Sequence, residues 1–112
     1  MIQTLSLKLS RHLSSLAPGF EGHWAYVESS IDGKTQVVCA FKRYSWRWAN
    51  DYKFICPAWQ AEDLLRNWIQ ISDAKKLKRI WGHAEIISRL LYATDHGNPY
   101  QKIEEYLCSI LK

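Results

Sequence analysis

The chain has 112 residues, an apolar fraction of 47%, and 15 basic against 11 acidic residues, which give a net charge of +4. A chain of this length forms one domain that buries about two-thirds of its unfolded surface, so we expect a single domain over residues 1–112. No stretch approaches the roughly 18 consecutive apolar residues that a membrane-spanning helix requires, so we expect a soluble protein with no membrane partner.

The numbers and spacing of cysteine and histidine residues indicate which metal sites and disulfides the chain can form. The chain has three cysteines, Cys39, Cys56 and Cys108, which lie far apart in the sequence. An odd number of widely spaced cysteines does not suit a secreted disulfide framework, so we expect reduced thiols and a cytoplasmic location. The four histidines show no metal-ligand spacing with each other or with the cysteines. The sequence has no glycine-rich phosphate loop and no nucleophile motif. We therefore expect no metal, no cofactor and no enzymatic activity.

Residues 1–20 predict an amphipathic helix that ends at Pro18-Gly19. Two alternatives stay open. Residues 5–9 alternate apolar and polar side chains as a short strand does, and the segment is basic and without acids, as an organellar transit peptide is. The apolar residues that support the helix, at spacings of three and four, are Ile2, Leu5, Leu9, Leu13 and Leu16.

The middle of the chain predicts a three-stranded antiparallel meander. Asp32-Gly33 is typical of a two-residue hairpin loop, because both positions tolerate positive φ. Such a loop sets Val27 opposite Val38 and Tyr26 opposite Cys39. A second turn at Asn50-Asp51 would return the chain as a third strand over residues 52–56. Pro57 cannot donate a ladder hydrogen bond and should end the sheet.

From Ala58 onward the apolar period changes from two to about 3.6, which predicts helices. Ser72-Asp73 offers a cap between the first helix and the second, Gly97 should end the second, and Asn98-Pro99 should begin the third. The predicted fold is α+β: an N-terminal helix, a three-stranded antiparallel β-meander, and three C-terminal helices packed on the sheet. The residues expected on the buried faces of these three helices are Ala61, Leu64, Leu65, Trp68 and Ile71, then Leu77, Ile80, Trp81, Ala84, Ile87 and Leu91, then Tyr100, Ile103, Leu107 and Ile110.

Aromatic and basic residues alternate along the predicted second strand. Tyr44, Trp46 and Trp48 share one face of that strand, and Arg43 and Arg47 share the other. The aromatic face either fills the core, stacks on unpaired bases, or forms a protein-protein hot spot. In either orientation the strand leaves a cationic strip exposed.

Positive charge is concentrated in two segments. Residues 42–53 carry a net charge of +3 and residues 75–89 a net charge of +4, so the rest of the chain is at −3. Lys75 and Lys76 fall in the first turn of the predicted second C-terminal helix, where free amide groups and the helix dipole favour anions. Arg79 and His83 would share a ridge with Lys75. The alternative is a pair of ordinary solvated faces.

These patches favour a small regulatory or accessory protein that contacts nucleic acid. The alternative is an adaptor or inhibitor that docks on a partner protein through the aromatic-basic strand, for instance on a component of a nucleic-acid-handling complex. The candidate binding residues for either partner are Lys42, Arg43, Trp46, Arg47, Trp48, Lys53, Lys75, Lys76, Lys78 and Arg79.

Overall fold

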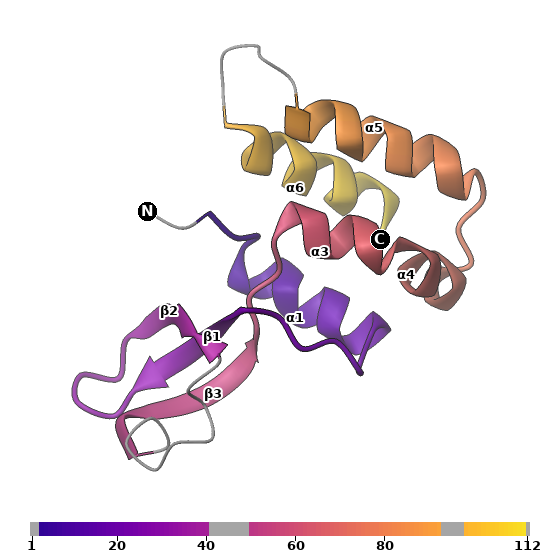
Figure 1. Ribbon diagram of the computed structural model, residues 1–112. Helices are drawn as coiled ribbons and strands as arrows, with labels where there is room; N and C mark the ends of the chain where they lie inside the picture. The colour runs from indigo at the N-terminus through magenta and orange to yellow at the C-terminus, as the bar shows by residue number, and fades with distance from the viewer. Residues whose placement is uncertain (1–2, 41–49, 93–97, 112) are drawn as a thin grey trace.

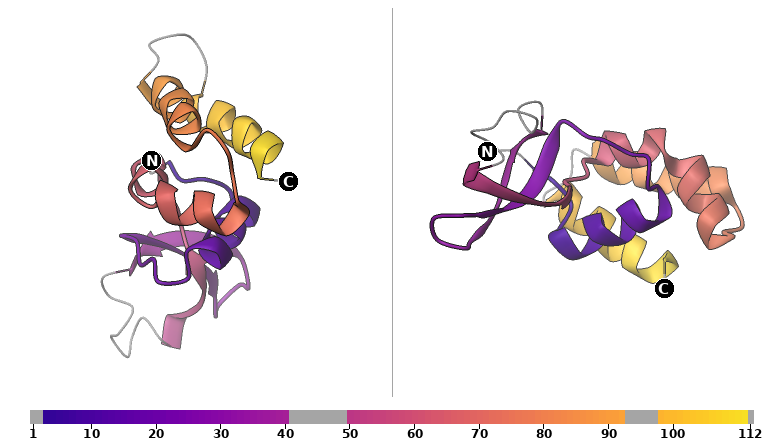
Figure 2. Two further views of the ribbon diagram at one scale, coloured as in Figure 1. Left: turned by 90° about the vertical axis from the view of Figure 1, so that its right-hand side faces the viewer. Right: turned by 90° about the horizontal axis from the view of Figure 1, so that it is seen from below.

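The computed structural model describes residues 3–40, 50–92 and 98–111. The sheet lies at one end of the molecule, α5 and α6 lie at the other, and α1 lies between them (Figures 1 and 2). The predicted α+β class and the order of an N-terminal helix, three antiparallel strands and C-terminal helices are confirmed. Within the described ranges, no helix is long and apolar enough to cross a bilayer. The elements are α1 (Leu7–Leu16), β1 (Trp24–Ser29), β2 (Thr35–Cys39), β3 (Tyr52–Pro57), α3 (Ala61–Arg66), α4 (Trp68–Lys75), α5 (Ile80–Tyr92) and α6 (Pro99–Ile110).

The strand order differs from the predicted meander. The order in the sheet is β2-β1-β3, so β1 is central and pairs antiparallel with both neighbours. After β2 the chain therefore crosses to the other edge of β1, where β3 pairs. A bulge interrupts β3, because Tyr26 pairs with Cys56 and Val27 with Phe54, which leaves one extra residue between them. The strand that the Asn50-Asp51 turn was expected to join to β3 falls in residues 41–49, outside the described residues.

The first hairpin turns where the sequence predicts, but its loop is longer. The Ser29 N–H donates to the Lys34 carbonyl over 2.9 Å and the Gly33 N–H donates to the Ser29 carbonyl over 2.8 Å, so the loop comprises residues 30–33. Gly33 has a φ of +70°. The pairing moves by two residues, which sets Tyr26 opposite Val37. A shift of two leaves every side chain on the predicted face.

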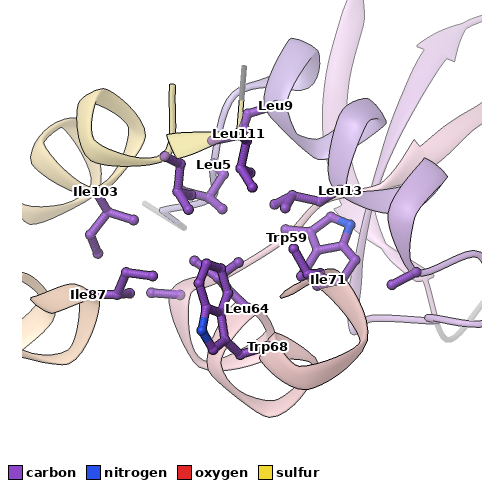
Figure 3. Close-up of a cluster of buried hydrophobic side chains, with 13 residues drawn as sticks. Leu5, Leu9, Leu13, Trp59, Leu64, Trp68, Ile71, Ile87, Ile103 and Leu111 are labelled. Atoms are coloured by element: carbon purple, nitrogen blue, oxygen red, sulfur yellow. The ribbon is translucent and has the colours of Figure 1, made fainter. Parts of the chain in front are cut away.

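The helical core is built around α1. The helix begins at Leu7, after Ser6, whose hydroxyl accepts a hydrogen bond from the Leu9 N–H over 3.3 Å. This confirms the helix over the strand alternative. The C-terminal helices were expected to pack on the sheet, but they pack mainly on α1 and on one another, while α1 contacts β3 (Figure 3). The buried residues of this core are Leu5, Leu9, Leu13, Ala17, Trp59, Ala61, Leu64, Trp68, Ile71, Ile87, Ile103, Leu107 and Leu111.

Helix breaks do not fall where the sequence predicts, and four C-terminal helices are described instead of three. Asn67 separates α3 from α4, and its carboxamide Nδ2 donates to the Asp63 carbonyl over 2.8 Å. The α4 helix then continues through Ser72 and Asp73, where a restart was expected. By contrast, α6 begins as predicted, with Asn98 Oδ1 accepting from the Tyr100 N–H over 3.0 Å.

Candidate nucleic-acid interface

Four of the predicted binding residues lie between the last residue of α4 and the start of α5, in a segment that we call the basic loop (residues 75–79). Lys76, Lys78 and Arg79 are exposed, and Lys75 is half-buried. None of the four side chains forms an ion pair within the part of the chain that the structure describes. The loop therefore presents uncompensated positive charge to its surroundings.

Backbone hydrogen bonds at the end of α4 fix the shape of the basic loop. Lys76 adopts the left-handed conformation with a φ of 53°, and its N–H donates to the Asp73 carbonyl over 3.1 Å. The Leu77 N–H donates to the Ser72 carbonyl over 2.9 Å, which completes a Schellman motif. The Leu77 side chain packs against the helical core. Leu77 thus anchors the loop while the cations on either side of it face outward.

The expected anion site at a helix start formed by Lys75 and Lys76 is wrong. Because α4 runs through Ser72-Asp73, both lysines lie at its C-terminal end. There the helix dipole is negative and each cation stabilises the helix by about 0.3–1 kcal/mol. The predicted ridge with His83 does not form either. His83 Nδ1 lies 2.5 Å from the Tyr106 hydroxyl, and burial raises the pKa of Tyr106 above its ordinary value of 10.0.

Arg79 is the cation that immediately precedes α5. It also has a positive φ of 56°, and its carbonyl accepts the His83 N–H over 3.0 Å. The Trp68 indole nitrogen donates to the Ile80 carbonyl over 2.8 Å, which ties the first turn of α5 to α4. No acidic residue lies in that first turn. The positive end of α5 and the side chains of the basic loop therefore add to one field.

Trp81 was expected on the buried face of α5, but 70% of it is exposed. The preceding residue, Ile80, packs against the core, and one step along a helix turns the side chain by about 100°. Ile86 and Tyr92 are also exposed on α5. Between them Arg89 pairs with Glu85 over 2.6 Å, which neutralises the charge on that part of the helix. From the basic loop to the outer side of α5, the surface thus changes from cationic to apolar and neutral.

The remaining predicted residues do not join the basic loop. Lys53 is exposed on β3, at the sheet end of the molecule, whereas α4 and α5 lie at the opposite end (Figures 1 and 2). Lys42, Arg43, Trp46, Arg47 and Trp48 lie outside the described residues, so whether the aromatic face of that segment is buried stays a prediction.

A cavity of about 340 Å³ lies between α1 and α6, and none of the predicted binding residues lines it. His12 Nε2 is buried and has no hydrogen-bond partner among the described residues. All three cysteines are free. In residues 3–40, 50–92 and 98–111 no cluster of three or more potential metal ligands occurs. The cavity is lined by Ser6, Lys8, Leu9, His12, Leu107, Cys108 and Leu111.

No protein-family model matches this chain, and no curated protein or solved structure matches it. Among residues 3–40, 50–92 and 98–111, the basic loop is the most concentrated cluster of cations.

Proposed function

We propose that this chain is a small non-enzymatic regulatory or accessory protein that contacts nucleic acid through the basic loop. One observation carries the proposal: residues 75–79 hold four cations, three of them exposed and none paired with a carboxylate within the described ranges. A rigid cluster of unpaired cations attracts a polyanion and gains entropy from released counterions when phosphates bind.

We also propose a second contact with nucleic acid and a cytoplasmic location. The second contact would be made by the cations of residues 42–53. Of these cations, Lys53 belongs to the described residues, and it is exposed. Because β3 is remote from the basic loop, this contact would engage a separate part of a long ligand (Figure 1). A cytoplasmic location is supported by three free cysteines, one of which, Cys108, is exposed and would oxidise readily outside a reducing compartment.

The test is a salt titration of oligonucleotide binding by fluorescence anisotropy, starting from about 50 mM salt, where non-specific attraction to phosphates is strong. Replacing Lys76, Lys78 and Arg79 with Gln should weaken binding. It should also flatten the plot of log affinity against log salt by about 0.7–0.9 for each phosphate that the variant no longer neutralises. Circular dichroism and a melting curve check that the variant is folded.

The matched control replaces three exposed cations elsewhere, Lys8, Arg11 and Lys34, with Gln. It removes the same charge from α1 and the hairpin, so affinity should fall much less than with the basic-loop variant. Equal reductions in the two variants would show that only overall charge matters. Wild-type protein that binds neither single strands nor duplex at about 50 mM salt would eliminate the proposal, because electrostatic attraction is strongest at low salt.

The alternative function, an adaptor or inhibitor that docks on a partner protein, is favoured by the exposed apolar residues Trp81, Ile86 and Tyr92 on α5. The other candidate for such docking is the segment around Trp46 and Arg47, which the sequence predicts as a strand and which lies outside the described residues. Trp46→Ala or Arg47→Ala should then weaken capture of the partner. A hydrophobic interface depends less on salt than phosphate contacts do. A partner that stays bound after nuclease treatment and at high salt would favour this alternative.

A further inference from the structure

Trp81 differs from Trp59 and Trp68 in exposure. Trp59 and Trp68 are almost completely buried, whereas 70% of Trp81 is exposed. Tryptophan is highly buried on average, and an exposed indole next to several cations is the combination that single-strand-binding surfaces use. Trp81 follows Arg79 by two residues and stands in the first turn of α5, at the end of the basic loop.

We propose that Trp81 is a stacking platform for an unpaired base, so that the basic loop binds single-stranded nucleic acid in preference to duplex. This inference rests on the proposed function of the loop. In a duplex each base is already stacked between its neighbours and its face is not available to a side chain. In a single strand every base has a free face, and an indole beside a cationic groove can stack on it whatever its sequence.

The surface around Trp81 leaves room for such a base. The next residue is Gly82, which is exposed and has no side chain. A Cβ placed at Gly82 would come closest to Arg79 Cβ, at 3.7 Å. The Arg79 side chain therefore starts beside the first turn of α5. We therefore expect a bound nucleotide to place its phosphate near Arg79 and its base on the indole of Trp81.

The charge pattern favours a nucleic acid over a protein partner at this position. The side chains that precede Trp81 are unpaired cations, which suit a repeated anion. One turn further, Glu85 and Arg89 neutralise each other over 2.6 Å. A protein that used Trp81 as an apolar anchor and supplied no carboxylates would bury several of the loop's charges without partners, which costs free energy.

The experiment compares Trp81→Ala with Tyr92→Ala, each measured against single-stranded and duplex oligonucleotides of equal length. Tyr92 is a good control because it lies on the same helix, is aromatic and is 67% exposed, but stands about 16 Å from Trp81 along α5. We expect Trp81→Ala to weaken single-strand binding roughly 5- to 150-fold, the range found for stacking aromatics. Duplex binding by Trp81→Ala and both affinities of Tyr92→Ala should change less than about twofold. Trp81→Phe, which keeps an aromatic face, should recover most of the affinity.

The outcomes separate this inference from the proposed function. If Trp81→Ala binds single strands as wild type does while the Lys76, Lys78 and Arg79 variant does not, stacking is wrong and the electrostatic proposal stands. Equal wild-type affinity for duplex and single strand also overturns the preference. If wild-type protein binds no nucleic acid at low salt, both proposals are wrong. Loss of affinity for a protein partner in Trp81→Ala, with oligonucleotide binding unchanged, would assign the indole to a protein interface instead.

Discussion

The indole nitrogen of Trp59 donates a hydrogen bond to the Ser14 hydroxyl over 2.9 Å, which joins the segment after β3 to α1. Trp59 is fully buried, and its ring packs against Phe20 with centroids 4.0 Å apart. The Trp59 carbonyl also accepts the Leu5 N–H over 2.7 Å. One residue thus connects the end of the sheet to the helix around which the core is built.

Removing this connection should destabilise the whole fold. We expect Trp59→Ala to lower the free energy of unfolding by about 3–5 kcal/mol, because it leaves a large cavity. Ser14→Ala should cost about 1–3 kcal/mol, since the indole N–H then has no acceptor. Urea denaturation of Ser14→Ala, Trp59→Phe and the double variant measures the coupling. Strictly additive effects in that cycle would contradict the hydrogen bond.

Two fully buried serines provide a second comparison. Ser10 Oγ accepts the Trp59 N–H over 3.2 Å and lies 3.3 Å from the Leu5 carbonyl, to which it donates. Ser72 Oγ is buried with no hydrogen-bond partner in the described part of the chain. We expect Ser10→Ala to cost about 1–3 kcal/mol and Ser72→Ala to stabilise by about 1 kcal/mol, because it removes an unsatisfied hydroxyl. Melting curves of the two variants should shift in opposite directions. A shift downward in both would place an unrecognised partner at Ser72.

Local patterns in the sequence predicted the elements well where the relevant interactions are local. Leu9 and Leu13 fall on one face of α1, and that face is buried. The Asn98-Pro99 start of α6 is likewise encoded in neighbouring residues. Strand order could not be predicted in this way. A third strand can pair with either edge of the first hairpin, and here β3 pairs with β1 and not with β2. Which edge is used depends on packing between segments that are distant in the sequence, and the spacing of apolar residues along the chain contains no information about that packing.

The sequence predicted which residues belong to the candidate site, but not how the backbone arranges them. The cluster Lys75–Arg79 is visible in the sequence, but whether it starts or ends a helix depends on where α4 stops. Ser72-Asp73 has the chemistry of an N-cap, yet Ser72 is buried on α4 and the helix continues past it. The exposure of Trp81 follows from the restart of the helix at Ile80. A continuous helix from Asp73 would have placed Trp81 one turn after Leu77, on the buried stripe.

Gly33 and Gly82 differ in backbone conformation, so substitutions at the two glycines should have opposite effects. Gly33 has a φ of +70°, so Gly33→Val forces a β-branched residue into a strained conformation and should destabilise the hairpin by more than about 1 kcal/mol. Gly82 is exposed in α5, and an added Cβ would make only an ordinary contact of 3.7 Å. Gly82→Ala should be neutral or stabilise by up to about 1 kcal/mol. Greater damage from Gly82→Ala in thermal melts would contradict the helix at that residue.

The free energy of unfolding should depend on Tyr26 at alkaline pH. Its hydroxyl donates to the Leu5 carbonyl over 2.6 Å, and burial is the main cause that raises the Tyr26 pKa above 10.0. Near neutral pH the phenol is protonated in both states and adds no pH dependence. Above about pH 10 the unfolded state loses its proton first, so the free energy of unfolding falls as pH rises.

Tyr26→Phe should therefore be less stable at neutral pH, by about 1 kcal/mol for the missing hydrogen bond, but its stability should fall less than that of wild type between about pH 9 and 11. Tyr92→Phe, at an exposed position, controls for the removal of one phenol from the chain. Urea denaturation across this pH range measures both effects. Parallel pH curves for wild type and Tyr26→Phe would contradict the assignment.

The left-handed backbone of Lys76 allows charge and strain to be separated at the proposed binding surface. Its φ of 53° is a conformation that glycine adopts without steric cost, whereas a residue with a Cβ does not. Lys76→Gly and Lys76→Gln both remove one cation from the C-terminal end of α4, so both forgo the same favourable interaction with the helix dipole. They differ only in the backbone preference of the new residue.

We expect Lys76→Gly to be more stable than Lys76→Gln by about 0.5–1 kcal/mol, because only the glutamine keeps the steric cost of positive φ. Both variants should bind single-stranded oligonucleotides more weakly than wild type, with a salt slope lower by about 0.7. Urea denaturation and anisotropy titrations on the same preparations measure the two effects. A glycine variant that is no more stable than the glutamine variant would show that the left-handed turn does not persist in solution. If affinity fell in the glycine variant alone, loop rigidity and not the charge of Lys76 would control binding.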